Sequence, residues 1–397
     1  MKNFIFPAAL TALCLLSCRS EAVPQDPAQD PSAPDPLPLV EVARMISALP
    51  MEAAQLREVH DAASASSGNG YDEEYTMRNL LEAPGAGVGD GPAARANASS
   101  RYPVPLRALI AEYLASRPSA PILRRFARRS GADEVQACLD ALSASDIQIY
   151  WPYSEDWDGA TFPLVTFDPG YGASSNYAYE LRRTESGLVV ADSVYVDENV
   201  ARSRPVWVIN RNSDSAFTPA EFFERGSVHP KEQEAPARAG QGRMLSLKSF
   251  KMLRNYDSWF AGASEFVVKI GGVNGFRAST EAELQLYSPT VTDFVIVVRR
   301  KELGLELPMQ SVLLTDFTDG LDKLVFLITE DDGGTWTSWK CSAAVKLQSK
   351  SYGFEIDLPY RDKDDIVWRG QLDASYFLRS KTVTGRFGDV MATFELE

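Results

Sequence analysis

The sequence predicts an α+β multidomain protein with a small N-terminal helical domain, a small middle β domain and a C-terminal antiparallel β-sandwich. Apolar residues recur at helical spacing from 37 to 145, and the spacing changes to strict alternation at Asp146. From 244 to 397, short alternating segments follow one another with eight to fifteen residues between turn signals. This spacing favours an antiparallel sandwich over βαβ units.

The first residues have the pattern of a secretory signal peptide. Lys2 precedes an apolar run that is too short to span a bilayer. The run ends at Leu15-Leu16-Ser17-Cys18, which resembles the bacterial lipobox, whose cysteine receives a diacylglycerol before cleavage. The resemblance implies that residues 1–17 are removed and that Cys18 carries the lipid. Cleavage by the general signal peptidase near Ser20 or Ala22 is the alternative.

Residues 18–36 are predicted to be a disordered tether, because five prolines alternate with small and polar residues and no apolar period is present. Proline favours an extended chain, so a tether of this length reaches roughly 55 Å from the membrane at about 3.1 Å per residue. Arg19 follows the cysteine, where an aspartate would resemble a signal for retention in the inner membrane. We therefore expect the protein to be anchored in the outer membrane. It can face either the periplasm or the cell surface, and the sequence leaves both alternatives open.

The chain is acidic, with a formal net charge of −14. Removal of residues 1–17 takes away only Lys2, so the charge of the mature chain is −15. Nucleic-acid binding depends on clustered Lys and Arg, and this balance excludes nucleic acid as an expected partner. No later apolar run reaches membrane-spanning length, so the lipid is the only expected contact with the membrane.

Helices are predicted wherever apolar residues follow the helical period. A polar segment rich in Gly, Ala, Ser and Pro at 84–105 is predicted to be a loop between them. The predicted helices lie at Leu39–Leu49, Met51–Ala65, Asp72–Leu81, Leu106–Leu114, Ser119–Arg129 and Asp133–Leu142.

Strands are predicted in both later domains, 146–225 and 244–397. A short helix at Pro219–Arg225 and a polar linker at 226–243 separate the two groups of strands. The strands of the middle domain are predicted at Ile147–Trp151, Leu164–Phe167, Tyr177–Leu181, Leu188–Val196 and Val206–Ile209. Those of the sandwich are predicted at Met244–Phe250, Glu265–Ile270, Glu281–Tyr287, Phe294–Arg299, Met309–Leu314, Lys323–Thr329, Cys341–Gln348, Tyr352–Leu358, Asp365–Arg369, Ser375–Leu378 and Val390–Leu396.

Few residues are available for nucleophilic or metal chemistry that uses histidine or cysteine. His60 and His229 are the only histidines, and no common catalytic or nucleotide-binding motif is present. After loss of the signal and lipidation of Cys18, Cys138 and Cys341 remain. They fall in different predicted domains, so we expect two buried thiols, with one disulfide as the alternative.

Thr329–Trp336 has the sequence TEDDGGTW and resembles the Asp-box of sialidase-type propellers. In that family the aspartate caps a hairpin turn and the tryptophan packs beneath it, which is a structural role. Propellers repeat this motif, and here it occurs once, so it predicts a single well-defined β-turn.

Two acidic segments are expected to share one rim of the sandwich, because alternate strands run in opposite directions. A calcium ion needs six to eight oxygen ligands, which two neighbouring acidic loops could supply. The alternative is a solvated rim with aspartates that shape turns. The residues of this candidate calcium site are Asp331, Asp332, Asp362, Asp364 and Asp365.

A segment at 151–159 places three aromatic residues beside carboxylates. Sugars stack on aromatic faces and glycosidases use two carboxylates, so one hypothesis is a glycan surface. The other is that the aromatic residues cover a small core. The residues of the candidate glycan surface are Trp151, Tyr153, Glu155, Asp156, Trp157 and Asp158.

Several segments resemble those of uncharacterised bacterial lipoproteins with a helical N-terminal part and a β-rich C-terminal part. They are Asp72–Tyr75, Trp151–Gly159, Asn255–Trp259 and Glu330–Gly334. The resemblance implies location and architecture and carries no catalytic residue. We therefore expect a lipid-anchored envelope protein with a non-enzymatic binding or assembly role, and a glycan or another envelope protein as its partner. The alternative is a carboxylate-dependent hydrolase that acts on glycan or peptide.

Overall fold

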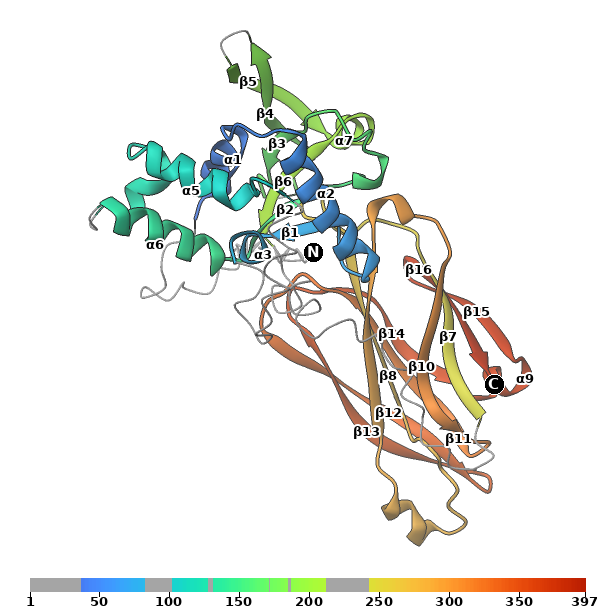
Figure 1. Ribbon diagram of the computed structural model, residues 1–397. Helices are drawn as coiled ribbons and strands as arrows, with labels where there is room; N and C mark the ends of the chain where they lie inside the picture. The colour runs from blue at the N-terminus through green and yellow to red at the C-terminus, as the bar shows by residue number, and fades with distance from the viewer. Residues whose placement is uncertain (1–36, 83–101, 128–130, 171, 185–186, 212–242) are drawn as a thin grey trace, which may run out of the picture. The chain divides into compact units, whose positions relative to one another are not determined.

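Three β-sheets and a group of helices make up the described part of this mixed α/β protein (Figure 1). The computed structural model describes residues 37–82, 102–127, 131–170, 172–184, 187–211 and 243–397. The predicted signal peptide and tether, residues 84–101 of the predicted loop, the predicted helix at Pro219–Arg225 and the linker up to residue 242 lie outside the described residues.

The first sheet has the strand order β1-β2-β6-β3-β4-β5, in which β3 and β6 are parallel and the other neighbours are antiparallel. Its strands are β1 (Glu74–Thr76), β2 (Ile147–Tyr150), β3 (Leu164–Phe167), β4 (Ser175–Thr184), β5 (Gly187–Asp197) and β6 (Val206–Arg211). The helical elements around it are α1 (Leu39–Ser47), α2 (Ala53–Gly68), α3 (Met77–Leu81), α5 (Leu106–Ser116), η1 (Pro121–Phe126), α6 (Gly131–Ser143), η2 (Ser154–Asp156) and α7 (Glu198–Ser203).

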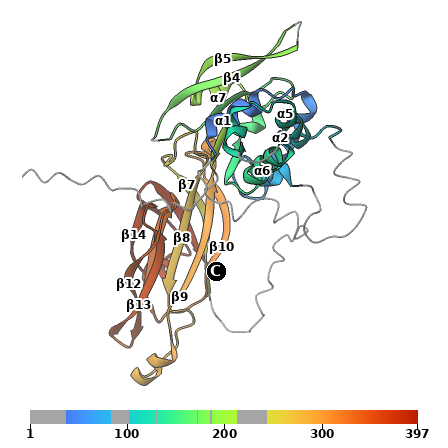
Figure 2. The same cartoon turned by 90° about the vertical axis from the view of Figure 1, so that its left-hand side faces the viewer.

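Apolar side chains from the helices and from one face of the first sheet form a single hydrophobic core. Val42 and Ile46 of α1 and Leu109 of α5 are buried in it together with Trp151 and Trp207. Figure 2 shows α1, α2, α5 and α6 gathered in one group. The helices and the strands that follow them therefore depend on each other for burial of apolar surface.

The second and third sheets are antiparallel throughout. The second has the order β10-β7-β16-β15, with β7 (Arg243–Met252), β10 (Leu307–Phe317), β15 (Thr382–Phe387) and β16 (Val390–Leu396). The third has the order β13-β12-β11-β8-β9, and β14 also pairs with β11. Its strands are β8 (Ser264–Gly272), β9 (Thr290–Val298), β11 (Leu321–Glu330), β12 (Trp336–Leu347), β13 (Lys350–Arg361) and β14 (Asp365–Asp373).

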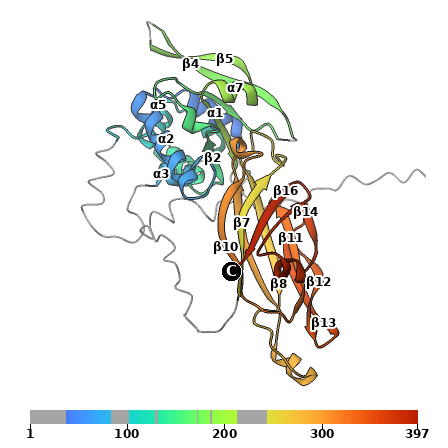
Figure 3. The ribbon, with the colours of Figure 1, turned by 90° about the vertical axis from the view of Figure 1, so that its right-hand side faces the viewer.

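These two sheets share a second hydrophobic core. Phe326 of β11 and Phe394 of β16 meet with ring centroids 5.6 Å apart, and Phe250 of β7 packs on Phe266 of β8 at 5.1 Å. Figure 3 shows β7, β10 and β16 running alongside β8 and β11. Aromatic pairs of this kind hold the facing sheets together beyond the effect of buried area alone.

The loop Asp257–Ala263 between β7 and β8 packs against the other face of the first sheet, and we call it the docking loop. Trp259 and Phe260 are buried with Tyr150 and Val208 of that sheet. A side chain of strand β6 also forms hydrogen bonds with the backbone of the docking loop. Asn210 donates to the carbonyl oxygens of Phe260 (3.0 Å) and Ala261 (2.6 Å).

The carboxylate of Asp72 accepts a hydrogen bond of 2.8 Å from the backbone N–H of Ala263. This close approach requires glycine at 262, because its φ is +139° and a Cβ there would lie 2.6 Å from a carboxylate oxygen of Asp72. Residues 37–211 and the C-terminal sheets are therefore joined through specific polar contacts as well as apolar packing.

Two predicted strands are helical turns in the structure. Glu281–Leu286 is a 3-10 helix (η4) none of whose residues is fully buried, and Leu284 packs against the edge of the second core. Ser375–Arg379 is a short helix (α9) that begins where the carboxylate of Asp373 accepts from the N–H of Ser375 (2.8 Å). Strand β15 was not predicted, and the predicted helix at Asp72–Leu81 is divided into β1 and α3 because Glu74–Thr76 pairs with β2.

Both cysteines of the described part are free thiols. Cys138 is buried in the first core, as expected, whereas Cys341 is only half-buried beside a small cluster between β11, β12 and β13. Among the described residues, no helix has the length and apolar character needed to cross a membrane.

Candidate functional site

Three carboxylates come together where β11 ends. Glu330 is the last residue of β11, Asp332 follows two residues later, and Asp257 begins the docking loop. One oxygen from each of the three lies within 4.8 Å of the others, and we call this group the acid cluster. Antiparallel pairing of Glu330 with Phe266 brings the end of β11 next to the start of β8, and thereby next to the loop that carries Asp257.

The acid cluster has a buried end and an open end. Glu330 has an exposed fraction of 0%, and neither of its carboxylate oxygens has a hydrogen-bond partner among the described residues. Asp257 is half-buried, and Asp332 is exposed. A small ion from solvent would therefore meet Asp332 first and Glu330 last.

Burial raises the pKa of every member of the acid cluster. Burial, followed by the neighbouring Asp257 and Asp332, raises the pKa of Glu330 to about 11, which the backbone of Glu265 opposes only in part. Burial raises the pKa of Asp257, although Glu330 and Arg300 act in the opposite direction. Burial and four neighbouring aspartates raise the pKa of Asp332 to about 6. At neutral pH without a cation, the cluster therefore holds at least one proton.

Three arginines of the same region, Arg254, Arg300 and Arg361, pair with carboxylates outside the acid cluster. Arg300 binds Glu198 at 2.9 Å and donates to the backbone oxygen of Asp257 at 3.1 Å. Arg361 pairs with Asp331 at 3.3 Å, and Arg254 pairs with Asp389 at 3.4 Å. No Lys or Arg among the described residues forms an ion pair with Asp257, Glu330 or Asp332.

The two acidic loops predicted to bind calcium do lie side by side. The carboxylate of Asp364 accepts from the N–H groups of Arg361 (2.8 Å) and Asp332 (3.3 Å). Asp362 accepts from the backbone and hydroxyl of Thr335 at 2.8 and 2.7 Å. Most of these aspartates therefore shape turns, and of the predicted calcium ligands only Asp332 is a member of the acid cluster.

Two further members of the predicted set lie around the cluster. Asp331 accepts from the N–H of Gly333 at 2.9 Å, and Asp365 is exposed beside Arg254.

Trp336 of the Asp-box-like segment is 68% exposed, with the guanidinium of Arg361 over its ring at 5.3 Å. It does not pack beneath the turn as the tryptophan of an Asp-box does.

The aromatic residues of the candidate glycan surface contribute to the protein core. Trp151 has an exposed fraction of 0% and contacts Trp207, Trp157 and His60 with ring centroids 5.6, 5.3 and 5.7 Å away. Tyr153 is buried and donates to Glu198 at 2.8 Å. This placement favours the interpretation in which the aromatic residues cover a core.

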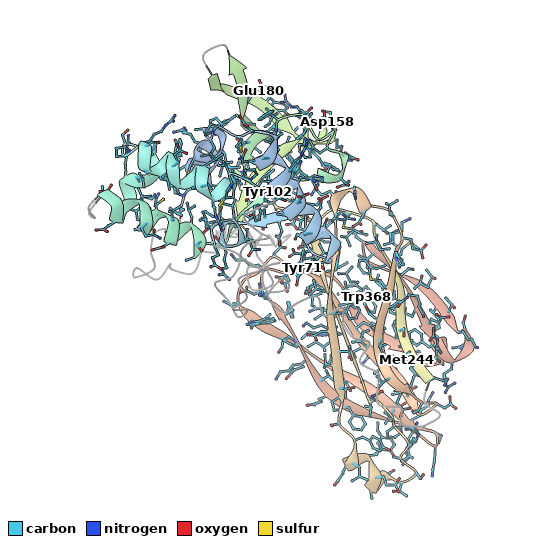
Figure 4. The ribbon with its side chains drawn as sticks, viewed as in Figure 1. Tyr71, Tyr102, Asp158, Glu180, Met244 and Trp368 are labelled. Atoms are coloured by element: carbon cyan, nitrogen blue, oxygen red, sulfur yellow. The ribbon has the colours of Figure 1, made fainter. Side chains whose placement is uncertain are left out.

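The carboxylates of the same segment are used in local contacts. Asp158, labelled in Figure 4, accepts three hydrogen bonds of 2.6–2.9 Å from Ala160 and Thr161 and so closes a turn. Glu155 pairs with Lys301, and Asp156 is exposed on η2.

The carboxyl groups of Glu155 and Glu73 influence each other's pKa. Burial and the hydrogen bond to Glu155 raise the pKa of Glu73, which is 2% exposed, to about 10. Burial alone would raise the pKa of Glu155, but hydrogen bonds from Glu73 and Lys301 outweigh it and lower this pKa below its ordinary value. Glu73 is therefore the protonated partner at neutral pH.

Because Glu73 is protonated in the folded protein, we expect the free energy of unfolding to fall as the pH rises. The folded-state pKa of about 10 lies above the ordinary value of 4.5, so between these values the folded protein holds a proton that the unfolded chain has released. Each such group lowers the free energy of unfolding by up to about 1.4 kcal/mol per pH unit. We expect Glu73→Gln, which retains a donor toward Glu155, to reduce this slope between pH 6 and 8 in denaturant titrations.

Glu281→Gln is the matched control, because Glu281 is exposed and its pKa is lowered by hydrogen bonds from Tyr352 and Lys350. It should leave the slope between pH 6 and 8 unchanged. Equal slopes in the native protein and in Glu73→Gln would show that Glu73 is ionised in the folded state.

Two members of the acid cluster, Asp257 and Glu330, were not predicted from the sequence. Asp257 lies in Asn255–Trp259, a segment that resembles those of other lipoproteins but has no chemical motif. Glu330 lies at a position where the Asp-box pattern allows any residue. The available signal was a carboxylate placed directly after the apolar run LVFLIT, where burial of the side chain is expected.

Neither a protein-family model, nor a curated protein, nor a solved structure matches this chain. The site is therefore interpreted from its own chemistry.

Proposed function

We propose that this protein is a lipid-anchored component of the bacterial cell envelope with a non-enzymatic binding or assembly role. The observation that carries this proposal is the apolar run that ends at Leu15-Leu16-Ser17-Cys18. A proline-rich tether of residues 18–36 then leads to the folded unit, which begins at Leu37. In this proposal the lipid on Cys18 holds the protein at the outer membrane, and the folded unit binds an envelope partner.

The contacts of residues 151–159 support a binding or assembly role rather than a role as a carboxylate-dependent hydrolase. The hydrolase hypothesis needs two available carboxylates near 151–159. Glu155 is in an ion pair with Lys301, and Asp158 closes a turn, so both have structural partners. The buried Trp151 stabilises the core and offers no stacking surface.

The sheet arrangement supports a two-part layout for the folded unit. We propose that residues 243–397 form a β-sandwich, because the second and third sheets enclose one core. The docking loop then connects this sandwich to the α/β part at 37–211.

Replacement of Cys18 tests the anchor. In Cys18→Ala, metabolic labelling with a fatty-acid analogue should be lost and the protein should leave the membrane fraction, because no other residue is expected to carry lipid. Cys14→Ala is the matched control, since Cys14 lies within the predicted signal peptide and should not affect labelling. Persistent labelling of Cys18→Ala would contradict the proposal.

A further inference from the structure

The buried carboxylate of Glu330 lacks the partner that such a group requires. A buried polar group costs free energy unless it is hydrogen-bonded, and a buried charge requires a counter-charge. No donor group among the described residues lies in normal hydrogen-bond geometry to either oxygen of Glu330, and the charges of Asp257 and Asp332 disfavour its ionised form. Two species can satisfy this side chain, namely a proton shared with Asp257 or a cation.

The spacing of the acid cluster suits a calcium ion. Two oxygens that each lie 2.4 Å from one cation are at most about 4.8 Å apart, and Ca²⁺–oxygen distances are about 2.3–2.6 Å. The three carboxylate oxygens meet this limit. Mg²⁺ keeps several waters and is usually bound through one or two carboxylates, so a cluster of three carboxylates favours Ca²⁺ over Mg²⁺. Zn²⁺ sites usually contain nitrogen or sulfur ligands, and this cluster has neither.

The surrounding charge also favours a cation. Besides its own three carboxylates, the acid cluster has Asp331, Asp364 and Asp365 close enough to raise the pKa of Asp332. Arg361 and Arg300 are held by Asp331 and Glu198. A divalent cation would remove repulsion that the neighbouring arginines leave uncompensated.

We propose that Asp257, Glu330 and Asp332 bind one Ca²⁺ ion at the junction of β11 and the docking loop. Glu330 supplies the buried ligand, Asp257 the ligand from the loop, and Asp332 the ligand at the solvent side. Three carboxylates provide up to six oxygens, and water entering past Asp332 can complete a coordination number of six to eight.

The proposed ion has a structural consequence, because its ligands come from two segments. Glu330 and Asp332 belong to the end of β11, whereas Asp257 begins the loop whose Trp259 and Phe260 pack on the first sheet. Calcium would therefore fix the docking loop to β11 and strengthen the connection between the C-terminal sheets and the α/β part. This inference does not depend on the lipid on Cys18.

The test uses the full chain purified in detergent, with calcium chloride or a chelator. We expect millimolar calcium to raise the melting temperature by several degrees, because an ion that binds only the folded state stabilises it. Calorimetric titration should show one calcium site, and Glu330→Gln or Asp332→Asn should weaken it by at least about tenfold. Magnesium should give a much smaller melting shift.

Asp362→Asn is the matched control, because Asp362 lies on the same rim but bonds Thr335 and is outside the acid cluster. It should keep the full calcium-dependent shift, whatever its own stability. If Glu330→Gln fails to fold, Asp332→Asn still tests the site, because this side chain is exposed. A native melting temperature indifferent to calcium, a shift retained in Asp332→Asn, or a shift lost in Asp362→Asn would each overturn the proposal.

Discussion

Replacement of Trp151 by alanine is expected to lower the free energy of unfolding by about 3–5 kcal/mol, because it removes a fully buried indole and leaves a cavity. The side chain lies between the helices and the first sheet and contacts Trp207 and Trp157. Urea denaturation followed by tryptophan fluorescence and circular dichroism measures this change.

Trp336→Ala is the matched control, because that indole is 68% exposed. Its removal should change the free energy of unfolding by less than about 1 kcal/mol. If Trp151 instead belonged to an exposed glycan surface, the two variants would have similar stabilities. A small effect of Trp151→Ala would therefore contradict the packing described for this segment.

Replacement of Arg300 by methionine is expected to cost about 1.5–3 kcal/mol, because it removes the charge-assisted hydrogen bonds of a buried guanidinium. The side chain of Arg300 is 6% exposed and contacts Glu198 at 2.9 Å and the backbone oxygen of Asp257 at 3.1 Å. Methionine fills much of the same volume but cannot donate to either group. The loss should appear in urea denaturation and as faster proteolysis at the docking loop, which Arg300 helps to hold.

Arg277→Met provides the control for Arg300. Arg277 makes two hydrogen bonds to Asp316, at 2.6 and 2.8 Å, but is 51% exposed. Exposed pairs contribute about 0–1 kcal/mol, so this variant should remain close to the native stability. Equal losses in the two variants would show that Arg300 contributes no more than a surface ion pair.

Strands with strong apolar runs could be predicted from the sequence, because burial determines both the pattern and the structure. Strand β11 contains Leu324, Val325, Phe326, Leu327 and Ile328 in succession, and the prediction at Lys323–Thr329 lies within it. Strand β15 was missed because its residues are mostly exposed and include Gly385. Strand β1 was missed because it depends on pairing with β2, which is distant in sequence.

The acid cluster could be predicted only in part. The sequence places Asp332 next to a turn of the expected sandwich rim, and this residue is in the cluster. Asp257 joins it through the β8–β11 pairing and the course of the docking loop, which no local pattern specifies. Turn-shaping aspartates were the alternative prediction for this rim, and Asp362 and Asp364 do accept from backbone N–H groups. Which aspartates take this role depends on the folded loops and could not be predicted.

The mass of the mature N-terminal peptide tests the proposed anchor most directly. Digestion of the membrane-extracted protein should yield a peptide that begins at Cys18 and carries the added mass of a diacylglyceryl group on its sulfur, with or without a further acyl chain on its amino group. Such a mass would establish both the cleavage site and the lipid. An unmodified peptide that begins at Ser20 or Ala22, or a peptide that retains Met1, would contradict the proposal that this protein is held at the membrane by Cys18.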